Sequence, residues 1–412
     1  MATVNPFPNL QVLVWNAPAD FDLVQGLLTH GLVSLAITLE GDVNSQHPFL
    51  GRFDSFCPNI KALKWDFGSQ SNTLISNAVD AVSCSMLRLG GIESLEFFEP
   101  LDSLKGDRLK DIILSPDFKV LGIFLDYMFE PLEIDLTSGD TPFPNVETMK
   151  VEVWDLCLLT KLLRPHEQRF RNIELKLHPE GYRPFVNPIF SFFTGLDTPQ
   201  RINSLQSIIL SLHHDCFYEQ LQKVSELEDP SADFCLSYET LAPLASFRRL
   251  RQLSITLNNQ ISIDDIELGS LVRNWSSLEV LWLDCRSGRW PLAGAKYVTL
   301  RGLLTLIEAC PRLWRICLPI DAEIVPMDAS PDIRNTAIKT IRLPDSVIKN
   351  PLLVAEFFQK HLPSLVDVFD SARYGLWKGN EADLEEWRRM WDIVDNELYR
   401  GHCYSMYATD EF

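Results

Sequence analysis

One apolar spacing recurs along nearly the whole chain and restricts its fold more than any other feature. In the stretch CPNIKALKW, residues 57–65, Ile60, Leu63 and Trp65 stand at positions i, i+3 and i+5. This spacing suits neither a helical stripe nor a strict strand alternation. It returns mostly every 22 to 35 residues, with one gap of 45. The clear copies are Leu10/Leu13/Trp15, Leu32/Leu35/Ile37, Ile60/Leu63/Trp65, Ile92/Leu95/Phe97, Phe118/Leu121/Ile123, Val146/Met149/Val151, Leu205/Ile208/Leu210, Leu250/Leu253/Ile255, Leu278/Leu281/Leu283, Leu313/Ile316/Leu318 and Ile338/Ile341/Leu343, with degenerate copies in 170–177 and 365–368.

Each copy of the spacing predicts one short strand. Its last two apolar residues are two positions apart, so they point inward from one strand face, and their neighbours point outward. A strand with a single apolar face needs neighbours, so the units stack into a parallel sheet. This is the leucine-rich-repeat signature. The predicted fold class is an α/β leucine-rich-repeat solenoid, a horseshoe of about 12 to 13 units, with strands on the concave side and helices on the convex side.

The residues between the strands show helical periodicity. It is clear in TLRGLLTLIEACP at 299–311, with Thr299 as the expected cap, and in NPLLVAEFFQKHLP at 350–363. The stretches 71–86 and 154–163 behave alike. The pairs Cys57-Pro58 and Cys310-Pro311 mark where a returning helix ends, because proline forbids further helix. We expect both cysteines to pack in tight corners.

Composition limits the class of partner. The 412 residues include 37 basic and 56 acidic side chains, a net charge of −19. This charge repels nucleic acid and anionic membrane surfaces, so we expect neither as a partner. The nine cysteines stand singly without a CxxC pair, which favours buried thiols in a reducing compartment. No signal peptide and no apolar run of membrane-spanning length is found, so we expect a cytoplasmic or nuclear protein.

The C-terminal residues form a separate element in this interpretation. We expect the solenoid over residues 1–380 and a capping helix and tail over 381–412. In ADLEEWRRMWDIVDNELYRG, residues 382–401, five apolar residues fall on one helical stripe. The stripe either covers the open end of the last repeat, which solenoids require, or recruits a partner helix. The five residues are Leu384, Trp387, Trp391, Val394 and Leu398.

Two units are longer than the rest and carry the sequences YEQLQKVSELEDPSADF, residues 218–234, and CRSGRWPLAGAKY, residues 285–297. Their breaker residues predict projecting loops, and loops on a rigid scaffold often bind ligands. A small-ligand sensor that uses these loops is therefore a third possible function, although no motif points to it.

One cluster of residues in the sequence could bind a metal ion, HHDC at residues 213–216. Adjacent residues on an extended chain point in opposite directions, so His213 and His214 hardly share a metal ion without a third segment. No nucleotide-binding, nucleophile-elbow or zinc-protease motif is present. We therefore expect no enzyme, no cofactor and no metal site.

The outward positions of the strands predict a binding surface on the concave side. It includes Lys64 and Phe98 in early repeats and Trp282, Asp284, Arg315 and Arg342 near the C-terminal end. Trp and Arg are enriched among interface hot spots, and Arg suits capture of a carboxylate or phosphate. The expected ligand is a protein that presents an acidic or phosphorylated segment. The alternative is structural: Trp282 covers its neighbours while Arg315 pairs with Asp284.

The repeats resemble those of a known family. The sequences CPNI, CPRL, FPNL, FPNV and LPSL precede strands, and residues 241–322 are similar to the fungal F-box-like leucine-rich-repeat proteins. The resemblance implies a non-catalytic protein-recognition module, the substrate-binding part of a ubiquitin-ligase receptor. It implies docking on a Skp-type adaptor only if an F-box is encoded upstream, because the first strand begins by residue 10. The alternative is a free-standing scaffold or regulator unrelated to ubiquitin.

Overall fold

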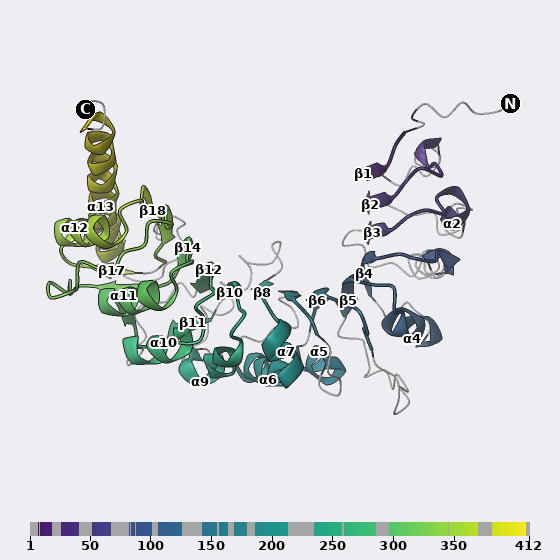
Figure 1. Cartoon of the computed structure of the whole chain (residues 1–412), viewed down its shortest axis with the longest axis horizontal. Coiled ribbons are helices and arrows are strands. Elements are labelled where there is room, and N and C mark those ends of the chain that lie inside the picture. The colour runs from purple at the N-terminus through teal and green to yellow at the C-terminus, as the bar shows by residue number, and fades with distance from the viewer. Residues whose placement is uncertain are drawn as a thin grey trace. The chain divides into compact units, whose positions relative to one another are not determined.

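The computed structural model describes residues 7, 9–18, 26–40, 52–66, 82, 84–86, 88–100, 106–125, 142–154, 156–163, 169–178, 186–212, 235–257, 259–285, 296–344, 346–369 and 381–408. The chain forms two compact units, Met1–Lys176 and Leu177–Phe412. Each unit is built from parallel strands backed by helices (Figure 1). The domain boundary expected at residue 380 stays a prediction.

The first unit contains seven strands among the residues that the structure describes, and their order across the sheet follows the chain. The short helices of this unit lie on one side of the sheet (Figure 1). The strands are β1 (Val12–Pro18), β2 (Ser34–Glu40), β3 (Ala62–Asp66), β4 (Ser94–Pro100), β5 (Val120–Leu125), β6 (Thr148–Val153) and β7 (Asn172–Leu177), and the helices are α2 (Phe53–Phe56), α4 (Gly106–Leu114) and α5 (Leu156–Leu163).

The second unit has the same design of parallel strands and helices. Its main strands are β8 (Ser207–Leu212), β10 (Gln252–Leu257), β12 (Val280–Cys285), β14 (Arg315–Cys317), β16 (Thr340–Arg342) and β18 (Asp367–Phe369). Its helices are α6 (Val186–Leu196), α7 (Pro199–Ser204), α9 (Tyr238–Leu241), the 3-10 helix η4 (Ala242–Ser246), α10 (Asp265–Val272), α11 (Leu300–Ala309), α12 (Pro351–His361) and α13 (Glu381–Ala408).

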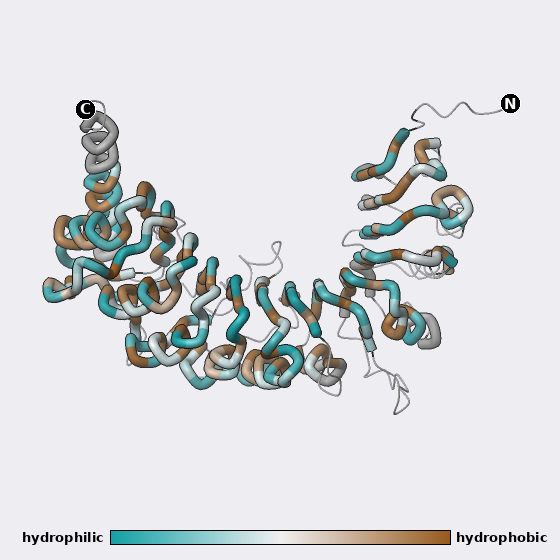
Figure 2. The backbone as a smooth tube through the Cα atoms, viewed as in Figure 1, coloured by the Kyte–Doolittle hydropathy of each residue, from teal (hydrophilic) through white to brown (hydrophobic). Residues whose placement is uncertain are grey.

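The register of the strands places equivalent apolar residues side by side. Leu253 of β10 pairs with Leu281 of β12, and Leu281 pairs with Ile316 of β14. All three are at most 1% exposed, and they face the helices. Apolar and polar residues alternate along the strands in both units (Figure 2). The α/β leucine-rich-repeat solenoid is therefore confirmed. We call the sheet surface opposite the helices the strand face.

Polar side chains lock the repeats in register at their turns. The Asn59 Nδ2 donates to the His30 carbonyl oxygen at 2.7 Å, and the Asn145 Nδ2 donates to the Pro116 carbonyl oxygen at 2.8 Å. In both cases the asparagine of a Pro-Asn pair reaches the turn of the preceding repeat. This interaction gives the Pro-Asn part of the CPNI and FPNV motifs a physical reason, because an unpaired carbonyl in a packed turn costs free energy.

Two smaller parallel sheets in the second unit were not expected from the sequence. One consists of β9 (Cys235–Ser237) and β11 (Gln260–Ser262), and the other of β13 (Val298–Thr299), β15 (Ile320–Ala322) and β17 (Val347–Ile348). Their strands are two or three residues long, which is too short for a periodic pattern to reveal.

The predicted helices and corners agree with the structure where it describes them. Helix α11 has Thr299 as its N-cap and Cys310 as its C-cap, and α12 begins after Asn350, whose side chain accepts from the Leu353 N–H. Cys57 and Cys310 are fully buried. Burial raises the pKa of the Cys57 thiol to about 11 and that of Cys310 to about 12, which keeps both thiols protonated and unreactive. Most of the helix expected at 71–86 lies outside the described residues.

Helix α13 packs against α12, β17 and β18. Three residues of the predicted stripe, Trp391, Val394 and Leu398, are at most 2% exposed. The Trp391 Nε1 donates to the Ser346 carbonyl oxygen at 2.9 Å, and the Asp395 carboxylate accepts from the Val368 N–H at 3.2 Å. The helix thus covers the end of the last repeat within its own unit. Among the described residues, no helix is both long enough and apolar enough to cross a membrane.

Candidate functional site

Four of the predicted binding residues lie together on the strand face of the second unit. We call Trp282, Asp284, Arg315 and Arg342 the Trp–Arg cluster. Strand β12 supplies the first two, β14 supplies Arg315 and β16 supplies Arg342. In the parallel register Trp282 aligns with Cys317, and Cys317 with Arg342. The repeat spacing therefore brings residues 60 positions apart in the sequence to within two strands of each other.

The aromatic ring of Trp282 is the centre of this cluster. The Arg315 guanidinium carbon lies 4.2 Å from the ring centroid, and that of Arg342 lies 5.6 Å from it. Both distances are within the range of a cation–π interaction. The half-buried indole therefore fixes the position of both guanidinium groups, one above it from β14 and one from β16.

The two arginines differ in their exposure and in their ion pairs. Arg315 is exposed, and among the residues that the structure describes no carboxylate pairs with it. The side chain of Arg342 is only 18% exposed, and its Nη2 lies 3.6 Å from the Asp284 Oδ2. The structural alternative from the sequence, an ion pair between Arg315 and Asp284, is wrong, because Arg342 takes that place.

The prediction that Asp284 is available on the binding surface is also wrong. Its side chain is 0% exposed. The longer Arg342 side chain reaches this carboxylate from two strands away. Asp284 therefore positions Arg342 and does not meet a partner.

A buried cysteine lies beneath this crossing. Cys317 alternates with the inward Ile316, so its side chain belongs to the strand face, yet it is 0% exposed. It stands in register between Trp282 and Arg342. To reach Asp284, the Arg342 side chain crosses β14, the strand that carries Cys317.

Trp314 borders the cluster and was missed by the sequence reasoning. It is 48% exposed and precedes Arg315 at the end of the sheet where the strands begin. At the equivalent position other repeats carry charged residues: the Lys119 Nζ lies 2.6 Å from a Glu93 carboxylate oxygen, and an Arg251 nitrogen lies 2.6 Å from one of Glu279. A tryptophan at a position that carries a charged residue in several other repeats was the available signal.

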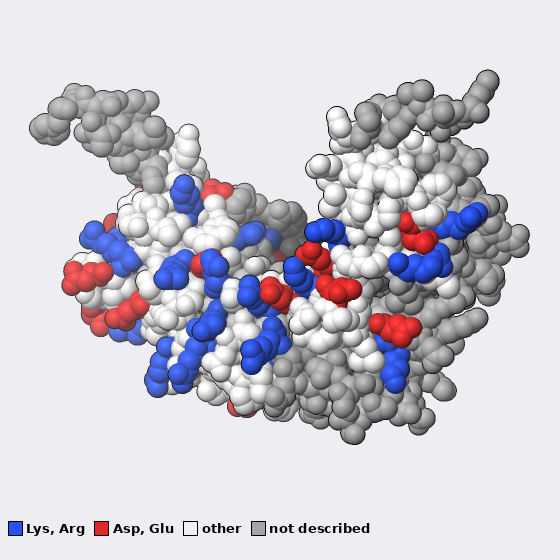
Figure 3. Space-filling model, turned by 45° about the vertical axis from the view of Figure 1, so that its right-hand side comes forward, with Lys and Arg blue, Asp and Glu red and all other residues white. Residues whose placement is uncertain are grey.

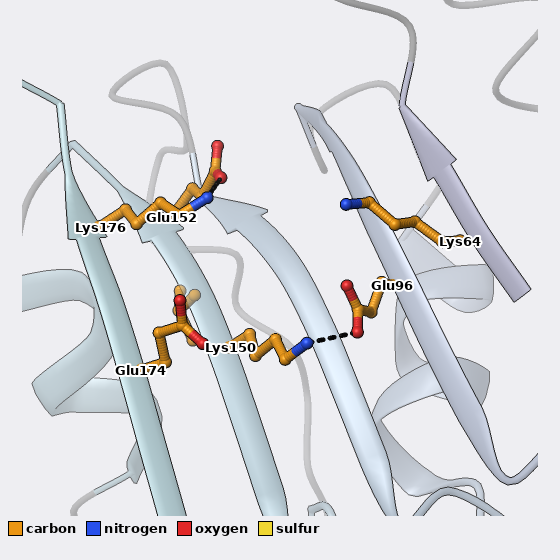
Figure 4. Close-up of a pocket in the computed structure, with 7 residues that line it drawn as sticks. Lys64, Glu96, Lys150, Glu152, Glu174 and Lys176 are labelled. Atoms are coloured by element: carbon orange, nitrogen blue, oxygen red, sulfur yellow. Dashed lines mark hydrogen bonds and ion pairs between the residues drawn. The ribbon is translucent and has the colours of Figure 1, made fainter. Parts of the chain in front are cut away.

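Lys64, the other described candidate, lies in the first unit and is exposed. Phe98 belongs to β4, but its side chain lies outside the described residues. Lys64 lines a pocket of about 150 Å³ together with Glu96, Lys150, Val151, Glu152, Glu174 and Lys176 (Figure 4). Glu174 and Lys176, on β7, were not among the expected surface residues.

Ion pairs between strands line this pocket. The Lys150 Nζ lies 2.5 Å from the Glu96 Oε1, and the Lys176 Nζ lies 2.9 Å from the Glu152 Oε1. The first pair spans the strand that carries Gly122, because Glu96, Gly122 and Lys150 are in register. Burial opposes the charged form of Lys176, but the hydrogen bond and charge of Glu152, together with the charges of Glu174 and Asp66, raise its pKa overall. This arrangement stabilises strand register and leaves little unmatched charge for a ligand. Charged side chains of both signs are also interspersed on the face shown in Figure 3.

The remaining candidates from the sequence give no site. The HHDC cluster and the loop at 218–234 lie outside the described residues, as do residues 286–295 of the second loop. Among the residues that are described, no group of three or more histidine, cysteine or acidic side chains could hold a metal ion.

Similarity to known proteins is found among solved structures. No protein-family model matches the chain, and no curated protein matches it. Among solved structures it is similar to a chain of the yeast Rad7–Elc1 complex, at 12% identity and a TM-score of 0.48 over 87% of this chain and 75% of that one. It is also similar to the leucine-rich-repeat-containing protein LegL7 from Legionella pneumophila, at 12% identity and a TM-score of 0.34 over 93% and 97% of the two chains.

Proposed function

We propose that this chain is a non-catalytic protein-recognition module that binds its partner on the strand face of the second unit. The observation that supports the proposal is Arg315, which is exposed, held against the Trp282 ring at 4.2 Å, and not engaged by a carboxylate among the described residues. A guanidinium held in place loses less conformational entropy when it binds than a mobile one does. Its donors suit an anionic group on the partner.

The other cluster residues support this single anchor. Trp282 supplies the aromatic ring against which Arg315 packs, while Asp284 pairs with Arg342, whose guanidinium carbon lies 5.6 Å from the ring centroid. Binding energy at protein interfaces concentrates in a few Trp, Tyr and Arg residues. We therefore expect Arg315 and Trp282 to carry most of the affinity, and we expect the pocket at Lys64 to contribute little.

The finer part of the proposal is that the module is the substrate-binding part of an F-box ubiquitin-ligase receptor. It rests on the resemblance of residues 241–322, which include Trp282, Asp284 and Arg315, to F-box-like repeat proteins. A free-standing scaffold remains the alternative. Co-purification of a Skp-type adaptor with the product of the complete transcript supports the receptor role, and its absence from that product favours the scaffold.

The experiment that tests recognition is affinity capture with the full chain and two matched charge reversals. Arg315→Glu removes the anchor, whereas Arg312→Glu makes the same charge change at an exposed turn residue outside the strands. We expect Arg312→Glu and the unmodified chain to recover the same partner and Arg315→Glu to lose it. Circular dichroism establishes that both variants are folded. Equal recovery by both variants contradicts the proposal.

A further inference from the structure

We infer that the Trp–Arg cluster binds the carboxylate of an unphosphorylated aspartate or glutamate that stands next to an apolar residue. This inference rests on the proposed function and names the ligand of the same site.

The first argument is the charge of the cluster. Arg315 and Arg342 carry two positive charges, and the buried Asp284 cancels one of them. Among the described groups near the cluster, Arg251 is already paired with Glu279 at 2.6 Å. The three charged side chains of the cluster itself therefore offer about one unit of positive charge, which a single carboxylate neutralises.

A phosphate group fits this charge less well. A phosphorylated side chain carries about −1.5 to −2 charges at neutral pH. It would leave excess negative charge near Asp284 and Asp367. The net charge of −19 on the whole chain repels a dianion more strongly than a monoanion. Asp284 thus favours a carboxylate ligand over a phosphate group, because its ion pair occupies the guanidinium of Arg342 that a phosphate group would otherwise bind.

The second argument is the apolar border of the site. Trp314 is 48% exposed next to Arg315, and Val366 is 44% exposed at the equivalent position of β18. The backbone hydrogen bonds Trp314 N to Glu279 O and Val366 N to Lys339 O place them at the same end of their strands. A ligand whose carboxylate reaches Arg315 can rest a neighbouring apolar side chain on Trp314. Each such contact adds affinity in proportion to the apolar area that it buries.

Synthetic peptide arrays probed with the purified full chain test this inference. The arrays share randomised flanks and differ in one fixed central residue, which is glutamate, glutamine, phosphoserine or a C-terminal carboxylate. We expect the glutamate array to bind about tenfold more strongly than the glutamine array, which is the loss of one charge-assisted hydrogen-bonded pair. Aromatic or branched apolar residues should be enriched beside the glutamate, and Trp314→Ser should remove that enrichment without removing the glutamate preference.

The outcomes separate the inference from the proposed function. Preference for phosphoserine or for the C-terminal carboxylate, abolished by Arg315→Glu, overturns the inference and leaves the recognition site in place. Binding that is equal for glutamate and glutamine overturns the inference as well. Peptide binding that Arg315→Glu does not change overturns both. Asp284→Asn provides the reverse test, since it should raise the signal of the phosphoserine array relative to glutamate.

Discussion

The guanidinium of Arg342 lies 3.6 Å from the carboxylate of Asp284, across the strand that separates them. The carboxylate is fully buried, so this ion pair belongs to the structure of the protein and not to its surface. Removal of one partner from a buried ion pair leaves an uncompensated charge. We therefore expect Arg342→Ala to lower the free energy of unfolding by about 3–5 kcal/mol, measured by urea denaturation.

Arg315 provides the matched comparison for Arg342. It touches the same ring but is exposed, so Arg315→Ala should cost about 0.5–1 kcal/mol. The reactivity of Cys317 towards a thiol reagent is a second measurement. Arg342→Ala should make this buried cysteine accessible to the reagent, and Arg315→Ala should not. Equal stability losses in the two variants, or a Cys317 that stays protected in both, would contradict this division of roles.

The fold could be predicted from the sequence because burial determines it locally. Leu253 and Leu281 belong to separate copies of one spacing, and identical spacings produce adjacent strands in register. Even the degenerate copies at 170–177 and 365–368 form strands β7 and β18. The site was only partly predictable. The side of the sheet on which Asp284 lies follows from the sequence, but its ion pair is with Arg342, 58 positions later and two strands away. The requirement for glycine at position 122 could not be predicted either. It arises from the ion pair between Glu96 and Lys150, which spans the strand that carries Gly122.

The inward leucines of the central repeats are expected to be the main source of stability. Leu281 is 0% exposed and Leu253 is 1% exposed. Leu281→Ala or Leu253→Ala should cost about 2–5 kcal/mol, because each leaves a cavity. In a repeat array each repeat contacts mainly its neighbours. Hydrogen exchange should therefore rise first in β10, β12 and β14 for Leu281→Ala, and in β8, β10 and β12 for Leu253→Ala. Thr256→Ala, on the strand face, is the control and should change little; unchanged exchange in the leucine variants would contradict the register.

Gly122 should not tolerate a side chain. A Cβ atom added there lies 3.1 Å from the Glu96 backbone and side chain, which is closer than ordinary packing contacts. We expect Gly122→Ala to displace Glu96, weaken its ion pair with Lys150 and cost roughly 1–3 kcal/mol. At Gly90 an added Cβ has no neighbour within 4 Å, so Gly90→Ala is the control. Thermal unfolding of both variants decides the question, and an equal melting temperature for the two would show that the strands adjust freely.

Stability should depend on pH through Asp54 of α2. The Arg88 Nε and Nη2 donate to its two carboxylate oxygens at 2.8 and 2.9 Å, and this pairing lowers the pKa of Asp54 from 3.8 to about 2. A lowered pKa means that the ionised carboxylate stabilises the fold above about pH 4 and that this contribution is lost as the pH falls towards 2. The difference in urea midpoint between the unmodified chain and Asp54→Asn should be constant near neutral pH and narrow below about pH 4. A difference that grows as the pH falls would contradict the assignment.

Helix α13 should stabilise the last repeat through one face only. Val394 is fully buried against the repeat, while its neighbour Ile393 is 41% exposed. Val394→Asp places a charge in an apolar contact and should cost roughly 3 kcal/mol or more, whereas Ile393→Asp should cost about 0.5 kcal/mol or less. Because the detached helix uncovers β18 and α12, Val394→Asp and deletion of residues 381–412 should both promote self-association. Light scattering and hydrogen exchange across β16 to β18 provide the measurements. A deletion variant that stays monomeric with an unchanged melting temperature would instead assign the helix to a partner.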